Sequence, residues 1–250
     1  YLDESRPRSQ RSGVTAQTPR PPAIAVPYLM VVTMVSVVAA TIYVPSLPSI
    51  AISLGTSATM VQYSLTAFVL TFGIVQLWHG PASDRLGRYR VLAGSLGVFI
   101  IGTAVCAVAP SIEVLIIGRV LQGFGAAGVG VLPRAIARDQ FGHAASTRVF
   151  TYLSMAASAA ATASPVIGGS LQGLTGSWRI SFVLLGLLAV WVLFLSVRRA
   201  PVLATGSIER PAGVRGYLAD YWSLMCRAPF AFNVIGGGFV RSGFYAFIVS

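Results

Sequence analysis

Stretches of about 20 apolar residues recur along the whole chain, and each is long enough to cross a hydrocarbon core of about 30 Å as a helix. Inside lipid every backbone group must be paired within its own segment, and runs this long and continuously apolar do not suit barrel strands. The sequence therefore predicts an all-α integral membrane protein. The runs span about residues 27–47, 60–79, 91–109, 112–131, 150–173 and 180–197, and a seventh begins near 229.

The composition agrees with this prediction. Apolar residues make up 55% of the chain and charged residues 10%, whereas a soluble domain carries about 25% charged residues. The net charge of +11 does not indicate a nucleic-acid partner, because the basic residues, all of them arginine, are spread between the apolar runs. The positions of Cys106 and Cys226 do not suggest a disulfide framework.

The distribution of arginine predicts the orientation in the membrane. Fifteen of the 18 basic residues fall in the N-terminal segment and in the links after the second, fourth and sixth runs, whereas the links on the other side contribute only Arg179. We therefore expect a cytoplasmic N-terminus. The fifteen are Arg6, Arg8, Arg11, Arg20, Arg85, Arg88, Arg90, Arg134, Arg138, Arg148, Arg198, Arg199, Arg210, Arg215 and Arg227.

The apolar runs and the distribution of arginine together predict four regions. We expect a disordered cytoplasmic tail over 1–25, a six-helix bundle over 26–197, a cytoplasmic loop over 198–228 and the start of a seventh helix over 229–250. Six helices, a long loop and a further helix are typical of transporters built from two six-helix halves. We therefore expect this chain to be the N-terminal half of a longer protein.

The link between the second and third runs has the pattern Gly-x-x-x-Asp-Arg-x-Gly-Arg, formed by Gly80, Asp84, Arg85, Gly87 and Arg88. The chain must reverse there within a few residues, so both glycines suit tight backbone geometry. The carboxylate can sit against a helix N-terminus, and the arginines can bridge to carboxylates on a neighbouring helix end. The alternative interpretation is a turn that is merely basic because it faces the cytoplasm.

Arg119 lies inside the fourth run, roughly 9 Å along a helix from Glu113 at about 1.5 Å per residue. A charge at that depth is costly unless it meets a partner or a wet cavity, which makes it a functional candidate. The alternative is an arginine that extends to the interface. Polar or aromatic residues that could line the same cavity, or simply serve as interfacial or interhelical contacts, are Tyr43, Gln62, Tyr63 and Gln122.

The fifth run is crowded with small residues, among them Ser164, Gly168 and Gly169, and small residues let helices pack closely in lipid. Pro165 removes a backbone hydrogen bond and allows a kink. We interpret His79 and His143 as loop residues, and the sequence has no metal-ligand spacing, nucleophile triad or phosphate loop.

Three of these segments resemble motifs of the major facilitator superfamily. The pattern from Gly80 to Arg88 is similar to the cytoplasmic signature of that family, and residues 119–127 resemble its Arg-x-x-Gln-Gly-x-Gly-Ala motif. Residues 164–169 resemble its antiporter motif Gly-Pro-x-x-Gly-Gly, with Ser164 in place of the first glycine.

Other segments look like the Bcr/CflA branch of drug:proton antiporters. They are Tyr43–Pro48, Arg134–Asp139 and Trp178-Arg179, and the whole resemblance covers about residues 27–250.

The resemblance implies proton-coupled efflux of small amphipathic drugs or metabolites by alternating access. It implies a monomeric protein of the bacterial inner membrane, in contact with lipid and a small-molecule substrate and with no nucleic-acid partner. It also implies no cofactor other than the proton gradient as energy source. Because no catalytic constellation occurs in the sequence, we expect no enzymatic activity. The residues it assigns to proton coupling and the cavity are Arg119, Gln122, Thr41 and Tyr43, and those it assigns to gating are Gly80, Asp84, Arg85, Gly87, Arg88 and Asp139.

One position departs from the branch. Its members usually carry an acidic residue two positions before the Tyr of Tyr-x-Pro, and here that position is Thr41. A proton antiporter needs a titrating group in its cavity, so either the other half supplies that group, or coupling differs from the family norm, or the chain does not transport. The alternative functions that stay open are a non-drug metabolite transporter of the same fold and a non-transporting membrane fragment.

Overall fold

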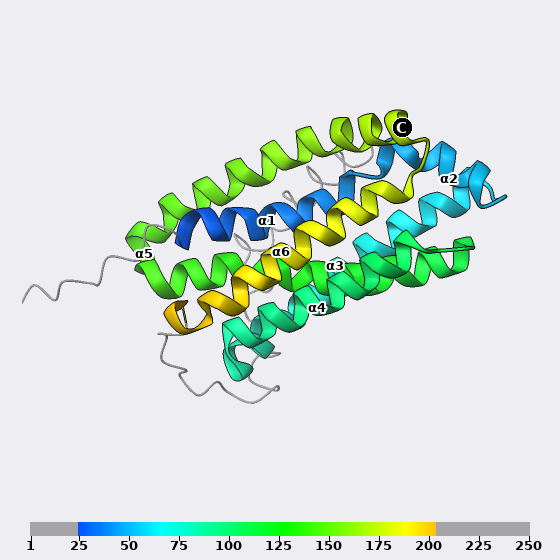
Figure 1. Ribbon diagram of the computed structural model, residues 1–250. Helices are drawn as coiled ribbons and strands as arrows, with labels where there is room; N and C mark the ends of the chain where they lie inside the picture. Colours follow the sequence, from blue (N-terminus) through cyan, green and yellow to red (C-terminus); the bar gives the residue numbers. More distant parts are fainter. Residues whose placement is uncertain (1–24, 204–250) are drawn as a thin grey trace, which may run out of the picture.

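The computed structural model describes residues 25–203, and every regular element within that range is helical (Figure 1). The all-α prediction is confirmed. The expectations for the tail, for most of the 198–228 loop and for the seventh helix fall on residues outside the described range. The elements are α1 (Ala25–Thr41), the 3₁₀ turn η2 (Val44–Ser46), α2 (Leu47–Ser53), α3 (Ala58–Leu86), α4 (Arg88–Ala107), α5 (Ile112–Thr175) and α6 (Arg179–Leu203).

The helix α5 consists of two antiparallel arms. Its backbone is non-helical at Gly142, where φ is 68° and ψ is 176°, a conformation that a residue with a Cβ rarely adopts. We call residues 112–141 the first arm and 143–175 the second arm. The segment 132–149, which the sequence predicts as the link between the runs 112–131 and 150–173, is therefore helical on both sides of a break at one glycine. The charged residues of that link lie near the helix ends.

Five segments within residues 25–203 are long and apolar enough to cross a membrane. The second arm of α5 is not one of them, because it is rich in alanine, serine and threonine, which are less apolar than leucine or valine. It nevertheless runs back along the bundle beside the other helices (Figure 1). The five segments are Ala25–Ser53, Ala58–Leu86, Arg88–Ala107, Ile112–Gly142 and Arg179–Arg198.

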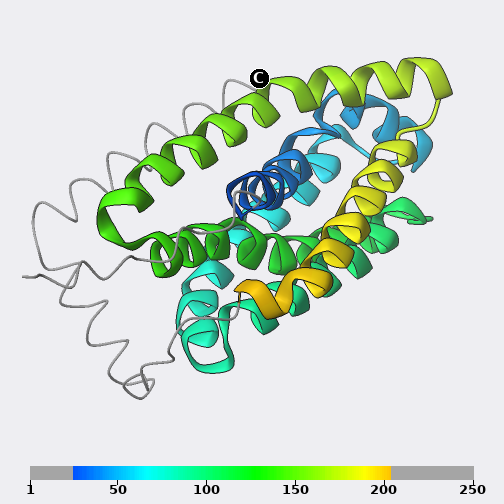
Figure 2. The ribbon, with the colours of Figure 1, turned by 60° about the vertical axis from the view of Figure 1, so that its left-hand side comes forward.

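α1 lies between the two arms of α5 (Figure 2). Its side chains Leu29, Val32, Val35 and Ala39 are completely buried. α3 and α4 pack against α5, and α6 packs mainly against α4. Residues near the end of α1 can therefore contact both arms at once. Polar groups of the two arms can meet there.

Candidate functional site

Arg119 lies on the first arm of α5 and has no exposed surface within the described part of the chain. Its guanidinium carbon lies 4.3 Å from the ring centroid of Tyr43 and 4.1 Å from that of Phe68. Cation–π contacts of this kind stabilise a desolvated cation by roughly 2 kcal/mol. Arg119 is thus enclosed by aromatic side chains, rather than facing the open cavity that the sequence led us to expect.

Hydrogen bonds attach Arg119 to α1 and, through Gln122, to α4. Its Nη1 donates to the carbonyl oxygen of Ala39 at 2.9 Å and to Oε1 of Gln122. Gln122 in turn donates from Nε2 to Thr103 Oγ1 at 2.8 Å, and this hydroxyl donates to the carbonyl of Phe99 at 2.7 Å. The structure therefore brings together the predicted pair Arg119 and Gln122 and fixes their geometry from three helical segments.

The position of Arg119 depends on the glycine of its own motif. A Cβ on Gly123 would lie 2.7 Å from the carbonyl oxygen of Phe68, so only glycine lets the first arm approach α3 this closely. This approach is what lets the Phe68 ring reach the guanidinium. Phe68 and Thr103 are site residues that the sequence did not single out, because an aromatic or hydroxyl residue inside an apolar run carries no signal of its partner.

No carboxylate pairs with Arg119 within residues 25–203. Asp84 and Asp139 pair with Arg88, and Glu113 lies exposed in the first turn of α5. An unpaired buried charge costs several kcal/mol even after relaxation. The aromatic rings and two neutral oxygens offset part of that cost, but none of them carries a negative charge that would balance the guanidinium.

Tyr43 and Thr41 separate in the structure. Tyr43 is buried against Arg119 and packs on Phe182, with ring centroids 5.6 Å apart. Thr41 instead places its Oγ1 2.5 Å from Oγ of Ser164 on the second arm. The sequence grouped Thr41 with Arg119, but the structure gives it a role in helix contact. Gln62 and Tyr63 are both exposed on α3.

The residues of the antiporter-like motif form the contact between the second arm and the end of α1. A Cβ on Gly168 would overlap the carbonyl oxygen of Ile42, and a Cβ on Gly169 would lie 3.5 Å from Pro45. Farther along, Gln172 donates a hydrogen bond to Ser49. Pro165 lies inside α5, in which Gly142 is the residue with non-helical angles. The motif therefore serves close packing.

A second polar cluster lies at the end of the bundle where α3 turns into α4. Arg88 pairs with Asp84 one turn earlier, and its Nε donates to Asp139 Oδ2 of the first arm at 2.9 Å. Its Nη1 donates to Ser83 Oγ at 2.5 Å. Arg88 thus connects α3, α4 and the first arm. These side chains are only partly buried, so the pairs contribute little to stability.

The turn itself is tighter than predicted. Gly87, with φ of 92°, is the one residue between α3 and α4, and a left-handed backbone of this kind favours glycine. Gly80 is helical, since α3 continues to Leu86, so the expectation that it shapes the turn is wrong. Arg85 lies exposed in the last turn of α3.

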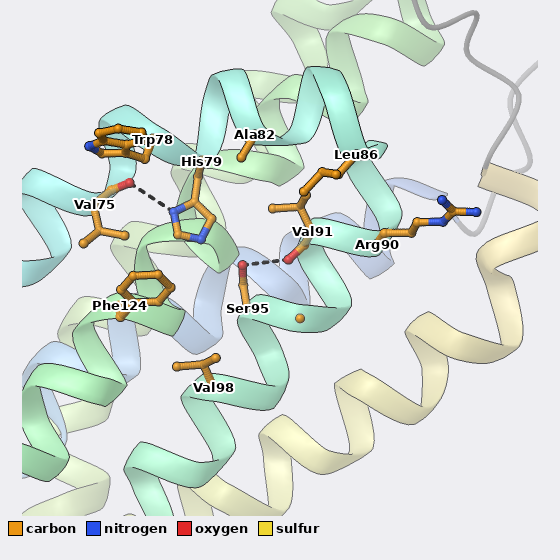
Figure 3. Close-up of a pocket in the computed structure, with 11 residues that line it drawn as sticks. Val75, Trp78, His79, Ala82, Leu86, Arg90, Val91, Ser95, Val98 and Phe124 are labelled. Carbon is orange, nitrogen blue, oxygen red and sulfur yellow. Dashed lines mark hydrogen bonds between the residues drawn. The ribbon is translucent and has the colours of Figure 1, made fainter. Parts of the chain in front are cut away.

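An apolar recess of about 440 Å³ opens between α3 and α4 (Figure 3). His79 lies inside α3 with its Nδ1 3.1 Å from the carbonyl of Val75, so it is not a loop residue. Arg90 extends away from the other lining side chains. None of the predicted site residues lines this recess. Its walls are formed by Val75, Trp78, His79, Ala82, Leu86, Arg90, Val91, Gly94, Ser95, Val98 and Phe124.

The part of the chain that the structure describes holds no cluster of histidine, cysteine or acidic residues that could bind a metal ion. His143 lies just after the break in α5. Arg119 and Arg88 each connect several helices through their guanidinium groups, which makes the clusters around them the candidate functional sites.

Several known proteins are similar to this chain. The family model described as Major Facilitator Superfamily matches residues 29–250. The chain is 31% identical over 207 residues to the uncharacterized MFS-type transporter YdgK of Bacillus subtilis, covering 82% of this chain and 52% of that protein. It is 33% identical over 175 residues to multidrug resistance protein D of Escherichia coli, covering 69% of this chain and 44% of that protein.

A third relative is the chloramphenicol resistance protein of Pseudomonas aeruginosa, 34% identical over 146 residues, with 58% of this chain and 35% of that protein covered. The chain thus spans about half, or less, of the length of these relatives. The crystal structure of the human organic anion transporter MFSD10 matches with a TM-score of 0.62 and 21% identity, covering 79% of this chain and 53% of that one. This last likeness concerns the fold alone.

Proposed function

The chain belongs to the major facilitator superfamily, and from this premise we propose that the complete protein is a proton-coupled exporter of small amphipathic drugs or metabolites. The proposed mechanism is alternating access, in which two six-helix halves rock about a site near the middle of the membrane. The chain itself is a multi-pass membrane protein with helices of spanning length.

The observation that carries the proposal is the buried charge of Arg119. Ionisable residues within membrane spans mark substrate or ion pathways, because their burial is too costly to persist without a use. Arg119 is fully buried in the first arm, and its hydrogen bonds reach Ala39 of α1 and Gln122. A group connected to two helices in this way can respond when those helices move relative to one another.

The drug-efflux part of the proposal draws on the relatives. Two of them are named for multidrug resistance and for chloramphenicol resistance. The segments Tyr43–Pro48, Arg134–Asp139 and Trp178-Arg179 resemble the Bcr/CflA branch, and we propose that the protein is a member of it, with drug:proton antiport as its activity.

The cluster around Arg88 is proposed to act as a conformational gate. It joins α3, α4 and the first arm at one end of the bundle through Asp84 and Asp139. Because the pairs are partly exposed, their net energy is small, and a shift of a helix by a few ångströms would break them. Such a contact can favour one access state without holding the protein in it.

The proposed orientation has this end in the cytoplasm of a bacterial cell, with the protein in the inner membrane. Arg85, Arg88, Arg138 and Arg148 lie on helix ends near the turns at Gly87 and Gly142, as the positive-inside rule would require. We further propose that the protein works as a monomer in lipid, needs no cofactor beyond the proton gradient and catalyses no chemical reaction.

One observation favours a second candidate, a non-drug metabolite transporter that is not driven by protons through this half. Thr41 contacts Ser164 where a titrating acid would be expected, and the three acidic residues within 25–203 lie at helix ends. A carrier of this kind would move its substrate without the pH gradient.

Transport by the complete protein in proteoliposomes tests both candidates. The probes are chloramphenicol, which is neutral, ethidium, which is cationic, and 1-naphthoate, which is anionic. We expect movement of at least one probe above that in protein-free liposomes, and only with an imposed pH gradient. Movement without the gradient would show that transport is not driven by protons, which contradicts the coupling part of the first candidate. Absence of movement for every probe contradicts the proposed exporter and leaves the non-drug carrier.

A further inference from the structure

Two nitrogens of Arg119, Nε and Nη2, have no hydrogen-bond partner within residues 25–203, although the side chain is fully buried. The N–H groups of these two atoms point in parallel along one edge of the guanidinium, and a carboxylate binds this kind of edge through both of its oxygens. Nη1, which is not part of this edge, already carries the bonds to Ala39 and Gln122. The unpaired edge therefore has the shape of a carboxylate site.

The surroundings of Arg119 lack a negative charge that would balance its guanidinium. Its hydrogen-bonding partners are a carbonyl and a neutral amide, and neither carries a negative charge. The acidic residues of the described helices are Asp84 and Asp139, which pair with Arg88, and Glu113, which is fully exposed. A buried cation gains most from a partner of opposite charge that pairs directly with it.

The surroundings of the guanidinium indicate what else the ligand must carry. The rings of Tyr43 and Phe68 pack on the guanidinium, so an anion has to approach in the plane of its N–H groups. Phe182 extends the aromatic surface beyond Tyr43, at a centroid distance of 5.6 Å. A flat carboxylate attached to an aromatic body fits both features, since aromatic rings associate favourably with one another.

We propose that the Nε/Nη2 edge of Arg119 binds the carboxylate of an amphipathic aromatic acid. This class of anion is then the preferred substrate, an assignment that rests on the proposed transport function. The substrate then supplies the negative charge that the described helices lack. In the described state the edge is enclosed by the bundle, and alternating access would open it to the acid.

Equilibrium binding to the complete protein in lipid nanodiscs tests this assignment. The probes are 1-naphthoate and 1-naphthamide, which share the ring system and differ in charge. A bidentate charge-assisted pair predicts about 10- to 100-fold tighter binding of 1-naphthoate. Arg119→Gln removes the charge, and Gln122→Glu neutralises it from the Nη1 side. Both variants should lose the preference for 1-naphthoate, and Gln122→Glu should still bind 1-naphthamide.

The matched control is Arg148→Gln, which removes one exposed arginine from the second arm and should keep the preference. Equal binding of the two probes by the parent overturns the proposal, as does a preference that survives Gln122→Glu. If Arg119→Gln does not insert, the parent and Gln122→Glu still decide the outcome. Movement of chloramphenicol or ethidium together with equal binding of the naphthalene probes leaves the exporter function intact and removes only this assignment.

Discussion

The hydroxyl groups of Thr41 at the end of α1 and Ser164 in the second arm of α5 lie 2.5 Å apart. Both side chains are almost fully buried, and Thr41 also donates to the carbonyl of Val37 at 3.1 Å. The position at which the resemblance expects a titrating acid is thus part of a helix contact. Thr41 therefore belongs to a packing contact that is separate from the proposed coupling site at Arg119, and each can be tested by itself.

Substitutions at Thr41 test the packing role. Thr41→Val removes the hydroxyl that bonds both to Ser164 and to the carbonyl of Val37, so we expect a loss of about 1–2 kcal/mol in the free energy of unfolding. Thr41→Asp places a carboxylate in the same buried contact and should destabilise the protein more. The measurement is the Tm of the purified complete protein. A Thr41→Asp variant as stable as the parent would mean that this position opens to water.

Gly168 tests the close approach of the second arm to α1. A Cβ there overlaps the carbonyl oxygen of Ile42, so Gly168→Ala forces the helices apart, at a cost of roughly 1–3 kcal/mol. The matched control is Gly173→Ala on the same arm, because nothing lies within 4 Å of a Cβ at that position. We expect a lower Tm for Gly168→Ala alone. Equal behaviour of the two variants would contradict the described contact.

Asp84 tests the proposed gate. Asp84→Asn removes one of the two carboxylates that pair with Arg88, and we expect strongly reduced transport with normal membrane insertion and little change in Tm. The effect should be on the balance of access states, so binding of 1-naphthoate should change less than its rate of transport. Normal transport by Asp84→Asn would reduce the cluster to a charged turn.

Cysteine labelling tests the orientation. Ser57 precedes α3 at one end of the bundle, and Ala145 follows the break at Gly142 at the other, and both are exposed. Single cysteines at these positions, in a protein whose own cysteines have been replaced, should react with a membrane-impermeant maleimide from opposite sides, with Ala145→Cys protected in intact cells. Labelling of both from the same side would rule out the proposed topology.

Much of the fold was readable from the sequence because the membrane leaves few choices for a long apolar run. The helices and the spacing of Arg119 and Gln122, one turn apart on one helix, follow from that constraint. The break at Gly142 did not, because a single glycine beside apolar residues such as Phe141 and Ala144 does not mark a turn. The sequence placed a loop where the structure has two helix ends.

The partners of the site residues could not be predicted because they come from other helices. Phe68 and Thr103 contact the Arg119 and Gln122 pair from α3 and α4, and only the packing of three helical segments brings them there. The same reason explains Thr41. The resemblance placed its position in the site of Arg119 and Tyr43, but Thr41 contacts Ser164 whereas Tyr43 contacts Arg119.

The central proposal is that the buried charge of Arg119 couples transport to the pH gradient. Its most direct test is pH-gradient-driven transport of 1-naphthoate by the complete protein in proteoliposomes, compared for the parent, Arg119→Ala and Arg119→Lys. We expect Arg119→Ala to abolish transport and Arg119→Lys to retain a fraction of it, because lysine keeps the charge but lacks the planar pair of donors. Transport by Arg119→Ala at the rate of the parent would contradict the claim and make Arg119 a packing residue.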